Sequence, residues 1–253
     1  MYTYAAKVDI GMSEHQNDDR VLVSDIILTD GIISGKIEKD TAVAAVSDGV
    51  GGLAQGYRAA VTTLERMSHL NIKDISIDDI KNAIEESNVR VRNIQSVENL
   101  HQGMMATIAG IYSDKDKFYV YNAGDSRVYR FRFKYIMQLS KDHSLVQDLV
   151  DLGEITPEEA KTHEKKNVIN KCIGYEEIVN ARIIDNSGDY LAGDIIIICS
   201  DGISDVVTDS EIKEIVYNHK LDEDLKECCI QIVDKAIENG SLDNLSVILL
   251  RKE

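Results

Sequence analysis

Two apolar segments of the chain end in the same tripeptide, Ser-Asp-Gly. One reads TAVAAVSDGV from Thr41, and the other reads DIIIICSDGIS from Asp194. Short apolar runs of this kind are typical of strands buried on both faces, and a carboxylate there is costly unless it is paired or binds a cation. The glycine that follows lets the main chain turn sharply. A single Asp-Gly is most often a turn, but the pair predicts a fold that presents Asp48 and Asp201 at sheet edges.

Length and composition favour a single domain over residues 1–253. The chain has 253 residues, of which 43% are apolar and 28% charged, and it shows no linker-like stretch. The formal net charge of −16 argues against nucleic acid and against an anionic membrane surface, because both would repel the chain. An acidic balance is compatible with a site that is loaded with cations.

The cysteines and the N-terminus predict an intracellular setting. The four cysteines have no CxxC spacing, so we expect buried free thiols in a reducing compartment. The opening MYTYAAKVDIG lacks the basic and apolar regions of a signal peptide. The longest strongly apolar run, Ile195 to Cys199, is far too short to cross a membrane. We therefore expect a soluble, cytoplasmic protein.

Hydrophobic periodicity predicts grouped strands and grouped helices. Strands are expected at residues 2–10, 21–28, 41–47, 105–112, 118–122, 128–133, 136–139, 179–184, 194–199 and 244–250. Helices are expected at residues 55–70, 77–94, 144–152 and 221–239, and after the capping residues Thr156 and Thr208. This grouping favours antiparallel sheets covered by helices over a parallel dinucleotide-binding sheet. The GxxxxGK[ST] and GxGxxG patterns are both absent.

Further acidic residues stand beside other strand ends. Asp18 and Asp19 lie in HQNDDR, Asp125 lies in YNAGDSR, and Asp243 with Asn244 lies in GSLDNLSV. No histidine or cysteine accompanies them at zinc spacing, and oxygen-only ligands favour magnesium, manganese or calcium. The loops do not follow an EF-hand pattern. Two hard ions held by shared aspartates form a clamp that binds phosphate oxygens and activates a water.

The acidic segments also carry a family resemblance. In chain order, NDD, SDGVGG, GMMAT, GDSR, SDGISD and DNLSV resemble the motif series of the metal-dependent serine/threonine protein phosphatases, the PPM or type-2C family. LSKDHSLVQDLVDLGEIT and HEKKNVINKCIG resemble the middle segment of bacterial members. The resemblance implies an α+β fold, a four-layer α-β-β-α sandwich of two antiparallel sheets flanked by helices. It also implies a flap-like segment at about residues 141–175, beside the active site.

A core site with two Mn²⁺ or Mg²⁺ ions follows from the same resemblance. Asp48 is expected to bridge both ions, the carbonyl of Gly49 to bind one of them, and Asp201 and Asp243 to complete the other. Asp18 is expected to hold a metal-bound water. Asp18, Asp48 and Asp201 are the catalytic residues in this interpretation.

The remaining implied roles concern the surroundings of the two ions. Asp19 and Asn244 support the ligand shell, and Asp125 together with Asp201 holds a third, weaker ion. The implied reaction is direct attack of a metal-bridging hydroxide on the phosphorus of phosphoserine or phosphothreonine in proteins. The expected partners are phosphorylated proteins and a serine/threonine kinase that acts on the same targets.

Two positions depart from the family pattern. Bacterial members usually carry an arginine four residues before the first acidic position, where it grips the substrate phosphate, but Glu14 stands there. Lys7, His15 and Arg20 are the candidate replacements. Val50 stands where many eukaryotic relatives have a histidine that is a proposed general acid. We therefore expect water or another group to protonate the leaving alkoxide.

Other polar and aromatic residues are interpreted as structural. Arg127 in GDSR is expected to fix a turn by pairing with a carboxylate, and His143 and His163 are expected to make local polar contacts. Sheet packing is expected of Tyr119, Tyr121 and Tyr129.

Two alternatives to a protein phosphatase stay open at this point. Glu14 is compatible with a pseudophosphatase, a binding module that senses metal or a protein partner. A phosphatase for a small metabolite is also compatible with the sequence, because substrate choice depends on the flap and the surface rather than on the metal site.

Overall fold

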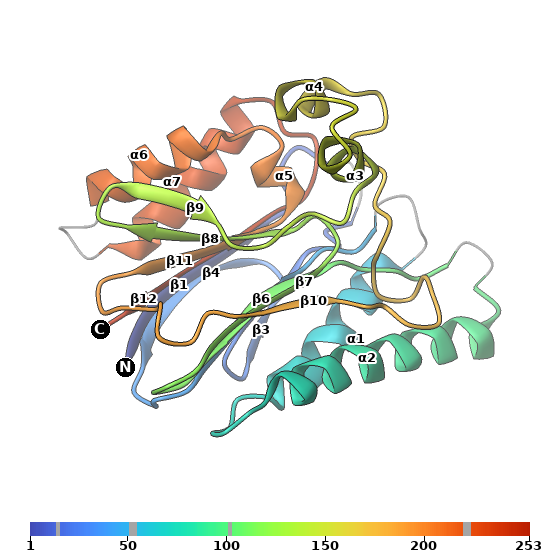
Figure 1. Ribbon diagram of the computed structural model, residues 1–253, viewed down its shortest axis with the longest axis horizontal. Helices are drawn as coiled ribbons and strands as arrows, with labels where there is room; N and C mark the ends of the chain where they lie inside the picture. Colours follow the sequence, from blue (N-terminus) through green and yellow to red (C-terminus); the bar gives the residue numbers. More distant parts are fainter. Residues whose placement is uncertain (14–15, 51–54, 101–102, 220–223) are drawn as a thin grey trace.

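Two antiparallel six-stranded sheets stack against each other, with helices on their outer faces (Figure 1). The computed structural model describes residues 1–13, 16–50, 55–100, 103–219 and 224–253. One sheet has the order β4-β1-β12-β11-β8-β9 and the other has the order β10-β7-β6-β5-β2-β3. The expected α+β sandwich of four layers is confirmed.

Each sheet combines strands from the first and the second half of the chain. The first sheet contains β1 (Tyr2–Asp9), β4 (Gly31–Ile37), β8 (Arg127–Arg132), β9 (Tyr135–Gln138), β11 (Ile195–Cys199) and β12 (Leu245–Lys252). The second sheet contains β2 (Arg20–Val23), β3 (Ile26–Leu28), β5 (Ala42–Ser47), β6 (Ile108–Ser113), β7 (Phe118–Ala123) and β10 (Arg182–Asp185). All strand pairs are antiparallel.

Two pairs of helices cover the outer faces. Helices α1 (Gly56–Ser68) and α2 (Ile77–Glu98) pack on the second sheet, and α6 (Asp209–His219) and α7 (Leu225–Glu238) pack on the first. The segment between β9 and β10 carries α3 (Leu145–Asp151) and α4 (Pro157–Thr162). The same segment approaches the one-turn helix α5 (Asp201–Ser204), because its Lys166 pairs with Asp205 directly after that helix.

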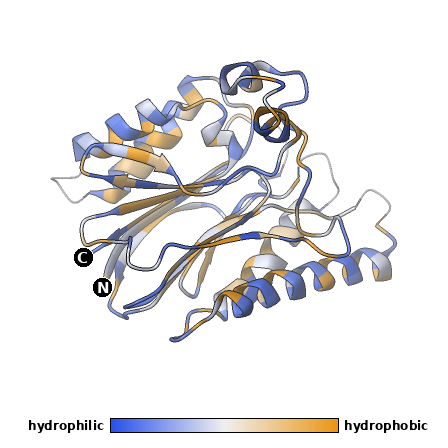
Figure 2. Ribbon diagram, in the orientation of Figure 1, coloured by the Kyte–Doolittle hydropathy of each residue, from blue (hydrophilic) through white to orange (hydrophobic). Residues whose placement is uncertain are grey.

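The two Ser-Asp-Gly strands are apolar on both faces because each lies between two cores. On β5, Val43 and Ala45 face α1 and α2, whereas Ala44 and Val46 face the other sheet. On β11, Ile197 belongs to the core under α6 and α7, and its neighbours on the strand belong to the core between the sheets. Figure 2 shows apolar residues gathered on the strands between the helical layers. Strands with both faces covered read as continuous apolar runs.

Capping at the helix starts follows the sequence closely. Ser76 and Asp79 form a capping box at α2, and Thr156 and Glu159 form one at α4, with Pro157 at the first turn. The same reciprocal bonds join Thr208 to its third neighbour, Glu211. Each box satisfies main-chain N–H groups that the first turn leaves without a partner.

Several predicted boundaries are wrong. The expected strand at 21–28 is two strands, β2 and β3, joined by a tight turn in which Ser24 has a φ of 55°. Strand β4 was not expected, because its two glycines and mixed exposure hide the alternation of a strand. The expected strand at 179–184 begins later, at Arg182. The expected helix at 221–239 begins at Leu225, because Asp224 is its N-cap and accepts from the main-chain N–H of Glu227; residues 221–223 of the expected range lie outside the described residues.

The four cysteines are buried and unpaired, as expected. Among the described residues, no helix has both the length and the apolar character needed to cross a membrane. The tyrosines at 119, 121 and 129 are buried in the cores, which confirms their packing role.

Candidate metal centre

The end of β5 is held in place by a hydroxyl. The main-chain N–H of Asp48 donates to Thr107 Oγ1 at 3.1 Å, and the N–H of Thr107 donates to the carbonyl of Asp48 at 2.8 Å. The Ser47 hydroxyl donates to the carbonyl of Thr107 at 2.6 Å. Thr107 Oγ1 also lies 2.7 Å from the hydroxyl of Ser126, in the GDSR turn. We call the end of β5 at Asp48 and Gly49, together with the acidic residues around it, the corner. Thr107 therefore joins this corner to the turn that carries Asp125.

Two glycines let a helix start directly beside this corner. A Cβ on Gly49 would lie 2.4 Å from the main chain of Gly56, and a Cβ on Gly56 would lie 3.0 Å from Asp18 Oδ2. Only residues without a side chain fit an approach this close. The contact brings the N-terminus of α1 next to Asp18 and Asp48.

Asp18 is fixed through both its main chain and its carboxylate. The N–H of Tyr57, in the first turn of α1, donates to Asp18 Oδ1 at 3.2 Å, where the helix dipole favours a negative charge. The N–H of Asp18 donates to Asn244 Oδ1 at 2.8 Å, and Asn244 Nδ2 donates to the carbonyl of Ile10 at 3.1 Å. Asn244 thus ties Asp18 to the start of β12.

Asp19 and Asp201 each keep one buried carboxylate oxygen that has no hydrogen-bond partner among the described residues. Asp19 is 1% exposed, and its Oδ2 accepts from Ser200 Oγ at 2.7 Å, while its Oδ1 has no partner. Asp201 begins α5, and its Oδ1 has none either. A Cβ on Gly202 would lie 2.1 Å from the carbonyl of Asn244, so the second Ser-Asp-Gly packs tightly on the loop that carries Asp243.

The carboxylates raise one another's pKa values. Burial raises the pKa of Asp48 and of Asp201 well above the usual range, and repulsion adds to it, led by Asp19 for the first and by Asp125 for the second. Burial raises the pKa of Asp19 to about 6 and that of Asp125 to about 7. The charge of Asp243 acts on Asp19, Asp48 and Asp201. A divalent cation would relieve this repulsion.

The donor set fits a hard cation. It consists of carboxylate and carbonyl oxygens, which suit Mn²⁺ and Mg²⁺, and two of the carboxylate oxygens are buried without a partner. In the described part of the chain, however, no three His, Cys, Asp or Glu side chains are already arranged around a common ion position. The predicted aspartates therefore meet at one corner without being closed into a finished ligand cage.

Comparison with known proteins gives the family. The model of protein phosphatase 2C matches residues 8–148 and 179–245. The chain belongs to the protein phosphatase 2C family. It is 28% identical over 249 residues to the serine/threonine protein phosphatase PstP of Mycobacterium tuberculosis, covering 97% of this chain and 44% of PstP. The chain thus spans less than half the length of that relative.

One further relative and one solved structure each match this chain over nearly the full length of both chains. The serine/threonine phosphatase stp of Listeria monocytogenes is 27% identical over 255 residues, covering 98% of this chain and 94% of stp. The solved catalytic domain of PstP, in complex with two manganese ions, has a TM-score of 0.78 and 26% identity, with 99% of both chains covered. A protein with this fold therefore binds two Mn²⁺ ions.

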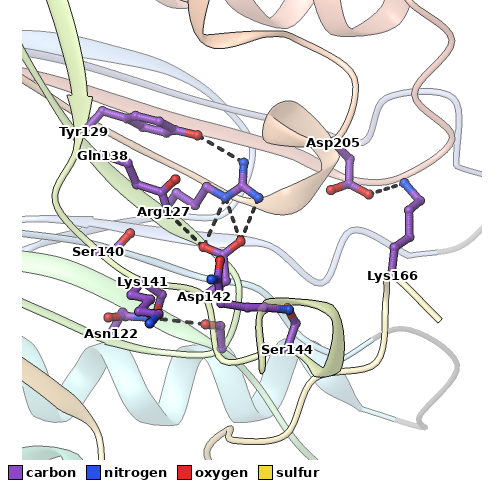
Figure 3. Close-up of polar contacts among 12 residues, drawn as sticks. Asn122, Arg127, Tyr129, Gln138, Ser140, Lys141, Asp142, Ser144, Lys166 and Asp205 are labelled. Atoms are coloured by element: carbon purple, nitrogen blue, oxygen red, sulfur yellow. Dashed lines mark hydrogen bonds and ion pairs between the residues drawn. The ribbon is translucent and has the colours of Figure 1, made fainter. Parts of the chain in front are cut away.

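Around the 2C-type corner, Arg127 has the structural role that the sequence predicted. Figure 3 shows its guanidinium against Asp142: Nε lies 2.9 Å from Oδ2 and 3.1 Å from Oδ1, and Nη2 lies 2.7 Å from Oδ2. Gln138 Nε2 donates to the same carboxylate at 2.9 Å, and Arg127 Nη1 lies 3.3 Å from Tyr129 Oη. The pair fastens the turn that carries Asp125 to the start of the 141–175 segment.

The same segment makes two further polar contacts near the corner. His143 Nδ1 accepts from the N–H of Gly124 at 3.4 Å, and burial, together with Lys171, lowers the pKa of His143 to about 4. Lys166 pairs with Asp205 at the end of α5 (Figure 3). His163 accepts from a neighbouring main-chain N–H at 3.1 Å, which is the local role expected for it.

The residues considered as replacements for the phosphate-binding arginine differ in their surroundings. Glu14 and His15 lie outside the described residues. Lys7 pairs with Asp9 on its own strand at 2.7 Å. Arg20 is 7% exposed and donates to main-chain carbonyls.

Sequence reasoning assigned no role to Thr107, Ser126, Gly56 or Ser200. Thr107 closes the GMMAT motif, and Ser200 opens the second Ser-Asp-Gly. The serine shared by both tripeptides was an available signal, because Ser47 and Ser200 each use their hydroxyl inside the site.

Proposed function

We propose that this chain is a metal-dependent phosphatase that hydrolyses phosphoserine and phosphothreonine in proteins. The observation that carries the proposal is that carboxylates from four separate motifs, those of Asp19, Asp48, Asp125 and Asp201, lie close enough in a 2C-family fold for their charges to act on one another or on a shared neighbour. Two of their oxygens are buried without a partner, and their pKa values are raised by burial and mutual repulsion. Perturbed carboxylates of this kind mark functional sites.

The proposed metal ligands are side chains and one carbonyl of the chain, held in position by neighbouring residues. The proposed ligands are Asp18 through a water, Asp48, the carbonyl of Gly49, Asp201 and Asp243, with Asp125 joining Asp201 at a third ion. When bound, such ions neutralise the phosphate oxygens and lower the pKa of the attacking water. Thr107 fixes the main chain at Asp48, and Ser200 orients Asp19, so the carboxylates are directed before substrate arrives.

The cellular setting is part of the proposal. We place the protein in the cytoplasm, as one 2C-type domain over residues 1–253 with the 141–175 segment acting as a flap beside the site. The names of its relatives support protein substrates, since PstP and stp are both called serine/threonine phosphatases. The natural counterpart is then a serine/threonine kinase that phosphorylates the same targets, and no role at a membrane is proposed.

Chelation and one neutral substitution test the proposal. Chelator-treated protein should be inactive toward an aryl phosphate and a phosphothreonine peptide, and Mn²⁺ should restore both activities. Asp201→Asn should remove activity, because it halves the charge that the two proposed ligands Asp201 and Asp243 present. Asp185→Asn, at an exposed end of β10, is the matched control and should behave as wild type.

Four outcomes would contradict the proposal. Full activity in chelator, or in Asp201→Asn, would rule out the metal mechanism. Hydrolysis of small phosphates without any hydrolysis of phosphopeptides would favour a metabolite phosphatase. Bound Mn²⁺ without hydrolysis of either substrate would favour a binding module.

A further inference from the structure

Arg20 is a buried cation that forms no ion pair with a carboxylate in the part of the chain that the structure describes. It is the first residue of β2, lies opposite Ser47 of β5, and is only 7% exposed. Within the described residues, no carboxylate lies at ion-pair distance from its guanidinium, and its Nε is buried without a hydrogen-bond partner. Burial lowers the pKa of Arg20, although the charges of Asp18 and Asp19 partly offset this. Burying an unpaired charge is expensive.

The contacts of Arg20 are to the main chain around Asp18. Its Nη1 donates to the carbonyl of Asn17 at 2.8 Å and to the carbonyl of Asp19 at 2.5 Å. These two carbonyls stand on either side of Asp18 in the chain. One nitrogen thereby bridges the Asp18 backbone, and both of its hydrogens are used.

Tyr57 completes the arrangement from the start of α1. The guanidinium carbon of Arg20 lies 5.8 Å from the centroid of the Tyr57 ring, a distance at which cation and ring attract. The main-chain N–H of Tyr57 donates to the carboxylate of Asp18. Tyr57 thus supports Arg20 with its ring and Asp18 with its backbone. Any rotation of the main chain at Asp18 would break contacts on both sides.

We propose that Arg20 is a positioning residue for Asp18 and Asp19, directing their carboxylates toward the metal corner. The inference rests on the proposed function, since it concerns the ligands of that site. A direct grip on substrate phosphate is not assigned to Arg20, because the side chain is almost fully buried and Nη1 is occupied by carbonyls. That role becomes an outcome of the test.

The test compares three variants at the Arg20 contact. Arg20→Met keeps the apolar stem but removes the bridge, and it should lower kcat about 10–100-fold, the usual effect of losing a group that orients a metal ligand. Its KM for a phosphothreonine peptide should stay within about twofold of wild type. Arg20→Lys retains a donor and should recover at least part of kcat. Tyr57→Leu removes the ring but keeps the main-chain N–H at position 57, so its kcat should lie between those of Arg20→Met and Arg20→Lys.

Mn²⁺ binding gives a readout that does not depend on turnover. Titration followed by electron paramagnetic resonance, without substrate, should show weaker Mn²⁺ binding in Arg20→Met than in wild type. Arg130→Met is the matched control. Its side chain is 11% exposed and also donates to a carbonyl, that of Asp189 at 2.8 Å, but it lies on β8 away from Asp18. The control should bind Mn²⁺ as wild type does.

Each result bears on the inference separately from the proposed function. A large rise in KM with unchanged kcat in Arg20→Met would overturn positioning in favour of a phosphate contact. Wild-type kcat and Mn²⁺ binding in all three variants would overturn any role. If Arg20→Met does not fold, Arg20→Lys and Tyr57→Leu carry the same comparison. If wild type hydrolyses nothing, the proposed function fails, whereas weaker Mn²⁺ binding in the variants still supports positioning.

Discussion

Replacing Asp19 with asparagine should stabilise the metal-free protein at neutral pH. Asp19 is 1% exposed, one of its oxygens has no partner, and burial raises its pKa from 3.8 to about 6. A tenfold change in proton affinity is worth about 1.4 kcal/mol. Keeping Asp19 ionised in the metal-free fold therefore costs about 3 kcal/mol at pH 7.5. Asparagine removes this charge and keeps an oxygen that can accept from Ser200.

The gain should depend on pH in a defined direction. The folded state holds the Asp19 proton more tightly than the unfolded chain does, so wild-type stability falls as pH rises through the window from 3.8 to about 6. Asp19→Asn has no such proton to lose. Its advantage over wild type should be near zero at pH 4 and should reach its full size above pH 6.

Thermal unfolding in chelator measures this difference. For a chain of this length, about 3 kcal/mol corresponds to a rise in Tm of about 6–12 °C at pH 7.5. Adding Mn²⁺ should reverse the order, because wild type gains stability from the ion and the variant gains less. The reasoning is refuted if Asp19→Asn is less stable than wild type in chelator at pH 7.5. It is also refuted if the gain is the same at pH 4 and pH 7.5.

Substitutions in two further contacts, the Arg127–Asp142 pair and the Thr107 hydroxyl, test the surroundings of Asp48 and Asp125. Arg127→Met should lower the free energy of unfolding by about 3–5 kcal/mol, because the buried Asp142 loses its cation. Adding Asp142→Asn to Arg127→Met should recover part of this loss of free energy of unfolding, measured by urea unfolding. A double variant less stable than Arg127→Met alone would contradict the pairing. Thr107→Val removes the hydroxyl that accepts from the N–H of Asp48 and should lower kcat about 10–100-fold, whereas Thr107→Ser should keep most of it. Equal losses in the two variants would contradict a specific role for the hydroxyl, because only Thr107→Ser keeps it.

The sequence predicted those parts of the site that are encoded locally. A continuous apolar run followed by Asp-Gly is readable without a structure, so the ends of β5 and β11 were placed to within a residue. Helix caps are local too, which is why the boxes at Ser76 and Thr156 were correct. Strand β4 was missed because Gly31–Ile37 contains Gly35 and a lysine and shows no clear alternation.

The parts that the sequence did not predict depend on distant partners. Gly56 matters only because it touches Gly49 across a helix start, and nothing in its own neighbourhood signals that contact. Arg127 was expected to pair with some carboxylate, but its partner, Asp142, becomes evident only when β8 and β9 bring the two together. Arg20 was weighed as a phosphate ligand, and its hydrogen bonds to the carbonyls beside Asp18 appear only in the fold.

The repulsion among the aspartates links stability to metal affinity. Each carboxylate whose pKa is raised by burial weakens the metal-free fold at neutral pH, and a cation that binds the folded state alone offsets that loss. At a free ion concentration of one hundred times Kd, the gain is about 2.7 kcal/mol. This gain is close to the loss of folding stability from the ionised Asp19 alone, about 3 kcal/mol. If the ion bound weakly, its binding energy would not offset the loss of folding stability that Asp19 causes. Metal affinity and the stability of the metal-bound protein therefore rise together. Thr107 and Arg20 influence both quantities, because they fix the positions of Asp48, Asp18 and Asp19.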